Sequence, residues 1–122
     1  MIDFGNNPVF KLKESSKYAE KVEELLVASE EVLDSYKAFR DGVVFTTKRI
    51  IVVNVQGLTG KKCDFTSIPY SKIQAYSVET AGSFDRDAEL DVHVSSVGRV
   101  RFEFKAKSSI LEISKHISRG VL

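Results

Sequence analysis

Cysteine, net charge and long apolar runs are all scarce in this 122-residue chain, and each shortage excludes a class of protein. The single cysteine, Cys63, cannot form a disulfide within the chain, which is typical of a reducing compartment. The 18 lysines and arginines nearly balance 17 aspartates and glutamates, and the net charge of +1 argues against a dedicated nucleic-acid binder. No apolar stretch approaches the roughly 20 residues that cross a bilayer.

The beginning of the chain also lacks a basic region followed by an apolar core, so we expect no secretory signal. These shortages together predict a cytoplasmic protein. Peripheral contact with the inner face of the membrane is compatible with this prediction. The length and the 43% hydrophobic content suit one domain with a single core. We expect residues 1–29 to form an N-terminal arm and helix within the same unit as residues 30–122.

Hydrophobic periodicity close to two predicts seven short strands. The clearest alternation is in the last third, where apolar and polar residues exchange strictly, as expected of antiparallel sheet with one buried face. Asp41-Gly42 indicates a hairpin turn in which glycine supplies a positive φ, and Pro69 indicates a strand end or edge. The expected strands are residues 32–39, 43–47, 50–55, 63–68, 73–80, 89–95 and 99–105.

Two amphipathic helices flank these strands. In the first, over residues 16–29, Ser15 or Ser16 is the expected N-cap. The second begins with the capping-box pattern of Ser109 and Glu112 and ends at Gly120. Pro8 argues against early helix, so the first dozen residues are expected to be an irregular arm. The apolar stripes of the two helices are Tyr18, Val22, Leu25 and Leu26 in the first, and Ile110, Ile113 and Ile117 in the second.

A seven-stranded sheet with one wet face must bury the other face, so it should curl into an antiparallel barrel or sandwich. The isoleucine stripe of the last helix must cover apolar surface, and the open end of the barrel is the place that we expect. The prediction is a mainly β, pleckstrin-homology-like (PH-like) barrel that is capped by a C-terminal helix and carries an extra N-terminal helix.

Several segments in order resemble the bacterial PH-like families. Tyr36, then Asp41-Gly42, then Thr46 with Lys48-Arg49-Ile50 follow the pattern of the first three strands of those families, and residues 68–73 match the segment before the fifth strand. The resemblance runs from residue 30 to the C-terminus. It implies a non-enzymatic domain assembled into a homo-oligomeric ring. Eukaryotic relatives hold phosphoinositide head groups with basic residues of the first hairpin, a lysine and arginine spacing that is absent here.

Catalytic and metal-binding patterns are missing from the sequence. HExxH and CxxC do not occur, and His93, His116 and Cys63 fall on three different predicted elements. We expect both histidines to be solvated and Cys63 to be a packed strand residue. Residues 57–62 lack the spacing of a phosphate-binding loop and the helix that should follow it. We therefore expect no enzyme, no metal and no cofactor.

Two binding hypotheses remain, and they use different residues. The favoured one is a non-catalytic interaction module that self-assembles, with the chain itself or another protein as partner, and with an exposed strand edge as a further route. In it the stripe of the first helix packs either on its own barrel or on a neighbouring subunit. The alternative is recognition of anionic lipid by basic residues in or beside hairpin loops, with no nucleic acid in either case. These basic residues are Arg40, Lys61, Lys62 and Arg99.

Overall fold

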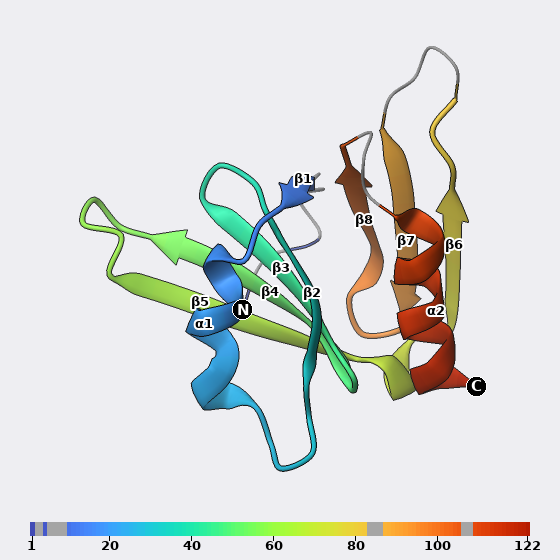
Figure 1. Ribbon diagram of the computed structural model, residues 1–122, viewed down its shortest axis with the longest axis horizontal. Helices are drawn as coiled ribbons and strands as arrows, with labels where there is room; N and C mark the ends of the chain where they lie inside the picture. Colours follow the sequence, from blue (N-terminus) through green and yellow to red (C-terminus); the bar gives the residue numbers. More distant parts are fainter. Residues whose placement is uncertain (2–3, 5–9, 83–86, 106–108) are drawn as a thin grey trace.

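The computed structural model describes residues 1, 4, 10–82, 87–105 and 109–122, in which one eight-stranded sheet is packed by two helices (Figure 1). The strands are β1 (Phe10–Glu14), β2 (Val32–Lys37), β3 (Asp41–Thr46), β4 (Arg49–Gln56), β5 (Lys62–Pro69), β6 (Ala75–Glu79), β7 (Ala88–Val94) and β8 (Gly98–Phe104). The helices are α1 (Lys17–Val22) and α2 (Ile110–Val121), with short 3-10 turns η2 (Glu23–Leu25) and η3 (Tyr70–Lys72). The expected mainly β architecture with flanking helices is confirmed.

The strand order is β5-β4-β3-β2-β1-β8-β7-β6. Neighbours are antiparallel except for β1 and β8, which are parallel. Among the described strands, β5 and β6 each pair on one side only, so the sheet stays open where a closed barrel would join its edges. The two halves turn towards each other about β1, and α2 lies against the half formed by β6, β7 and β8 (Figure 1).

The prediction of an irregular arm over the first dozen residues is wrong for residues 10–12, which belong to β1. This strand pairs with β2 on one side and with β8 on the other, and it thereby joins the two halves of the sheet. Leu12 is fully buried, while Lys11 and Lys13 are exposed, so the short segment has the alternation of a half-buried strand. The sheet consequently has eight strands where seven were expected.

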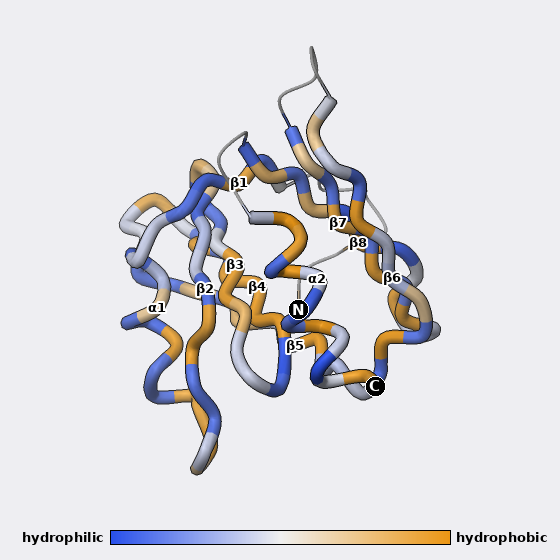
Figure 2. The backbone as a smooth tube through the Cα atoms, turned by 45° about the vertical axis from the view of Figure 1, so that its right-hand side comes forward, coloured by the Kyte–Doolittle hydropathy of each residue, from blue (hydrophilic) through white to orange (hydrophobic). Residues whose placement is uncertain are grey.

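The main core lies between the two halves of the sheet and α2. Ile110, Ile113 and Ile117 are buried in it, which confirms the expected stripe of the last helix. Aromatic rings fill its centre, with Tyr36 and Phe104 stacked edge to face at 5.0 Å between ring centroids. Figure 2 shows that hydrophobic stretches concentrate in β3 and β4, near the middle of the molecule.

A second, smaller core lies under α1 and explains why glycine stands at position 42. Tyr18 and Val22 are buried against Val44, Ile51 and Val53 of the same chain. A Cβ atom on Gly42 would come within 3 Å of the Tyr18 ring, and Gly42 lies inside β3. It has no positive φ, so the turn role predicted for it is wrong. The reason for the glycine is the close approach of a tyrosine ring.

The first helix is shorter than the expected residues 16–29. It ends at Val22, continues as η2 to Leu25, and the backbone is extended at Leu26. Ser29 then takes a φ of +70°, a left-handed conformation that breaks the helical path. The buried Glu30 carboxylate accepts a local hydrogen bond from the Val27 amide, and long-range hydrogen bonds from Thr46 and Arg49 hold it where a continued helix would run.

Three expectations for α2 are wrong. Ser109 precedes the helix but makes no side-chain capping bond, so the capping box does not form. Gly120 lies within the helix, where a Cβ would clash with the ring of Tyr70. His116 is buried, and its Nε2 lies 2.5 Å from Asp34 Oδ2, because α2 turns this face onto β2. His93, by contrast, is exposed as expected.

No helix in the described part of the chain is long and apolar enough to span a bilayer. Between the expected strands 73–80 and 89–95, residues 83–86 lie outside the described residues. Residues 57–60 lie between the expected strands 50–55 and 63–68 and form a loop, with positive φ at Gly57 and Gly60. Pro69 ends β5, also as predicted.

Candidate functional site: basic hairpin tips and a lysine pocket

The tips of the β2–β3 and β4–β5 hairpins meet at one end of the half of the sheet that contains β2, β3, β4 and β5. The Arg40 guanidinium donates a hydrogen bond to the carbonyl of Gly57, which ties the two tips together. A pocket of about 340 Å³ lies between these tips and α1. Phe39 is 95% exposed and Leu58 is fully exposed at its rim. The residues that line the pocket include the basic side chains Lys17, Lys21 and Arg40.

A second pocket of about 410 Å³ lies on the other side of Phe39. It is built on the outer face of β1 and β2 and on the residue that follows β8. Four lysines line it together with Ala38 and Phe39. The four are Lys11, Lys13, Lys37 and Lys105, and this site is called the lysine pocket below.

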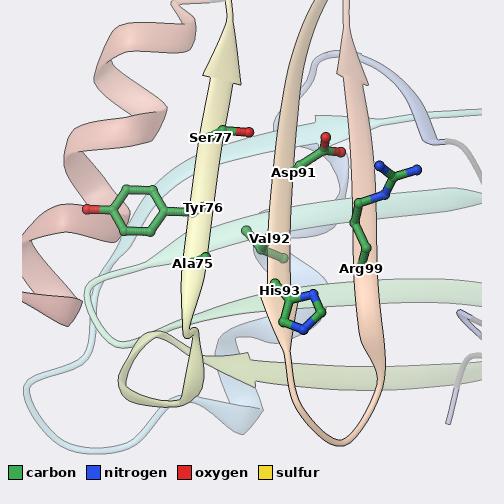
Figure 3. A pocket seen from close by; sticks show the side chains of 7 residues that line it. All are labelled: Ala75, Tyr76, Ser77, Asp91, Val92, His93 and Arg99. Atoms are coloured by element: carbon green, nitrogen blue, oxygen red, sulfur yellow. The ribbon is translucent and has the colours of Figure 1, made fainter.

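A third, smaller hollow of about 210 Å³ lies on the outer face of β6, β7 and β8 (Figure 3). Asp91 is held there by Arg101, with Nε–Oδ1 and Nη2–Oδ2 distances of 2.9 and 3.1 Å. This hydrogen bonding raises the pKa of the Arg101 guanidinium. Tyr76 points away from the hollow towards α2, where its hydroxyl lies 2.7 Å from Ser118 Oγ. The carboxylate is therefore already neutralised by an ion pair.

The predicted basic residues fall into two separate places. Arg40, Lys61 and Lys62 belong to the joined hairpin tips, since Lys61 precedes β5 and Lys62 begins it. Arg99 lies in the other half of the sheet, opposite His93 in the β7–β8 register and beside the third hollow. The structure brings three of the four together and leaves Arg99 apart. Their role in binding stays a prediction.

The predicted interface residues are also divided. Tyr18 and Val22 are buried on their own sheet, and Leu26 is half-buried there. Leu25 remains 40% exposed, next to Val27 at 57%. The stripe thus packs mainly on its own chain, and only its end is open to a neighbour.

Comparison with known proteins places the chain in one family. The model of the family described as "Bacterial PH domain" matches residues 3–121. The chain belongs to the bacterial PH domain family. The Bacillus subtilis protein YjqA, described as uncharacterized, is 46% identical over 98 residues, which is 79% of this chain and 78% of YjqA.

Two solved structures agree with this assignment. A DUF1696 family protein with a pleckstrin-homology domain from Shewanella loihica is 34% identical, with a TM-score of 0.77 over 93% of this chain and 99% of that chain. A pleckstrin homology domain from Shewanella amazonensis is 42% identical, with a TM-score of 0.63 over 88% and 87% of the two chains. The resemblance inferred from the sequence is therefore confirmed, and the chain is a PH-like domain.

Thr46 and Arg49, which belong to the segment that resembles the bacterial PH-like families, have a structural role that the sequence did not reveal. The carboxylate of Glu30, just before β2, accepts hydrogen bonds from Thr46 Oγ1 at 2.6 Å and from Arg49 Nε at 2.9 Å. Arg49 also donates to the carbonyl of Leu25 at 2.8 Å. Thr46 and Arg49 thus hold the segment between η2 and β2 in place.

The pKa of Glu30 in this ion pair shifts in the direction opposite to the effect of burial. Burial by itself would raise the pKa of Glu30, but the hydrogen bonds from Arg49, Thr46 and Val27 outweigh it and lower the pKa to about 2. Nearby, Tyr70 donates a hydrogen bond to the Thr46 carbonyl at 2.6 Å, and burial raises the pKa of its phenol. These contacts stabilise the fold and leave the hairpin tips, the lysine pocket and the sheet edges as the candidate binding features.

Proposed function

We propose that this bacterial PH domain is a non-catalytic binding module that self-associates through the edges of its open sheet. The observation that carries the proposal is the pair of edge strands, because β5 and β6 each leave one side unpaired in the described part of the chain. PH-like domains are generally binding modules, and the described residues hold no group of three or more side chains suited to a metal ion. An unpaired edge can accept another strand through backbone hydrogen bonds.

A head-to-tail assembly would use both edges of the sheet. In it the five-residue β6 of one copy would pair along part of the eight-residue β5 of the next copy. Such a heterologous contact gives a ring when the rotation closes and a filament when it does not. The exposed Leu25 and Val27 at the end of η2 add apolar surface for a neighbour.

Light scattering on a sizing column should give a fixed multiple of 13.6 kDa that does not change on dilution. Ser77→Lys places a charge on the exposed edge strand β6 and should shift the mass to that of the monomer. Ser95→Lys, in the exposed β7–β8 turn, is the matched control and should leave the mass unchanged. A wild-type monomer at every concentration would contradict the proposal.

A second candidate function is contact with an anionic membrane surface, favoured by the two exposed apolar side chains between basic groups. Phe39 and Leu58 stand at the joined hairpin tips, where they could enter the interfacial region. Arg40, Lys61 and Lys62 lie beside them and would attract anionic lipid.

Sedimentation with vesicles that contain phosphatidylglycerol tests this candidate. Wild-type protein should bind at low salt and dissociate as salt rises. Neutralising Arg40, Lys61 and Lys62 together should weaken binding roughly 100-fold, at about 1 kcal/mol per charge. Arg99→Gln should have no such effect, because Arg99 lies in the other half of the sheet. The membrane candidate fails if low-salt binding is absent.

A further inference from the structure

The lysine pocket concentrates positive charge in a chain whose net charge is only +1. Lys13 and Lys37 face each other directly in the β1–β2 register, an arrangement in which like charges repel. Lys11 lies on the same face of β1, two residues before Lys13, because the buried Leu12 between them points into the core. Lys105 follows β8, and its amide donates to the Leu12 carbonyl at 2.9 Å, which places it alongside β1.

The charges of these lysines are not neutralised by neighbouring carboxylates. Within the described part of the chain, none of the four lysines forms an ion pair at 4 Å or less. Glu103 stands opposite Lys11 in the β1–β8 register, yet no ion pair of 4 Å or less joins the two among the described residues. Four unpaired ammonium groups around one hollow create a local positive potential that favours a multivalent anion.

We propose that the lysine pocket binds a phosphate group carried by a larger organic ligand. A phosphate carries up to two negative charges and several acceptor oxygens, so one group can bridge ammonium groups from both β1 and β2. The pocket, at about 410 Å³, is in the size range of small-molecule sites and larger than a phosphate ion needs. The exposed Phe39 ring at its rim offers an apolar surface for the rest of the ligand.

The pocket adjoins the basic hairpin tips at Phe39, but its four lysines are different residues, and it depends on β1. Two of its four lysines, Lys11 and Lys13, come from this strand, which adds to the seven strands that the sequence pattern predicts. It uses neither edge of the sheet, so this proposal does not depend on self-association. The phosphate group could belong to a free phosphorylated compound or to the head group of a phospholipid.

Pyrophosphate titration of the full chain, followed by calorimetry and by thermal unfolding at matched ionic strength, tests the free source. Wild-type protein should bind pyrophosphate and gain thermal stability from it. Lys13→Gln with Lys37→Gln should weaken binding at least tenfold and remove the gain in Tm. The matched control, Lys48→Gln with Lys72→Gln, changes the net charge equally at exposed sites outside the pocket and should bind normally.

Vesicles of phosphatidylcholine with phosphatidylglycerol test the head-group source with the same variants. Binding of vesicles alone, weakened at least tenfold by the pocket variant and not by its control, would assign the phosphate to a lipid. A second pocket variant, Lys11→Gln with Lys105→Gln, repeats both arms without touching the facing Lys13 and Lys37 pair. Equal weakening by pocket and control variants, or no binding of either probe, would overturn the proposal.

Discussion

Replacing Arg49 by methionine should lower the free energy of unfolding by about 3–5 kcal/mol, because it leaves a buried carboxylate without its cation. The Glu30 side chain is only 1% exposed, and Arg49 binds it through Nε at 2.9 Å and Nη2 at 3.0 Å. Urea unfolding followed by circular dichroism measures the change. Arg101→Met is the matched control, since Arg101 pairs with Asp91 on the solvent-facing side of the sheet and should change stability little.

The ion pair of Glu30 and Arg49 should also make the free energy of unfolding decrease at acid pH. The pKa of Glu30 is about 2 in the folded chain and 4.5 in its reference state, so its stabilisation is complete above pH 4.5 and is lost as pH falls towards 2. The loss amounts to about 3 kcal/mol. Glu30→Gln should flatten this limb, and an Arg49→Met variant as stable as wild type would contradict the assigned role.

Leu12→Ala should lower the free energy of unfolding by about 2–5 kcal/mol, the cost of removing a large side chain from a packed core. Leu12 is fully buried in the main core, on the strand that joins the two halves of the sheet. Chemical denaturation again measures the change. Leu111→Ala on α2, where the side chain is 60% exposed, is the control and should have little effect. Equal stability of Leu12→Ala and wild type would mean that residues 10–14 behave as a loose arm.

Local patterns were sufficient for the position of β7, β8 and α2, although not for the length of α1. The alternation in β7 and β8 and the isoleucine stripe of α2 were predictable because the spacing of apolar side chains along the sequence indicates which face is buried. β1 was not predictable in the same way. Its five residues become a strand through pairing with β2 and with β8, and β8 lies about ninety residues away in the sequence.

The candidate sites show the same division. Arg40, Lys61 and Lys62 were correctly placed in or beside hairpin loops, but their proximity follows from the β3–β4 pairing and from the Arg40–Gly57 and Val55–Arg40 hydrogen bonds. The lysine pocket was missed, although Lys11 and Lys13 flank an apolar residue at strand spacing. The signal was present in two residues, whereas Lys37 and Lys105 joined them only through the strand order.

The sequence by itself determined the fold class, the family, most strand positions and the buried stripe of the last helix, because these follow from local hydrophobic periodicity and from matching segments. The tertiary structure decided which charges meet, where α1 ends, and why glycine stands at positions 42 and 120. Those outcomes depend on contacts between residues far apart in the chain. The sequence contains both residues of such a contact, but only the folded sheet brings them within contact distance.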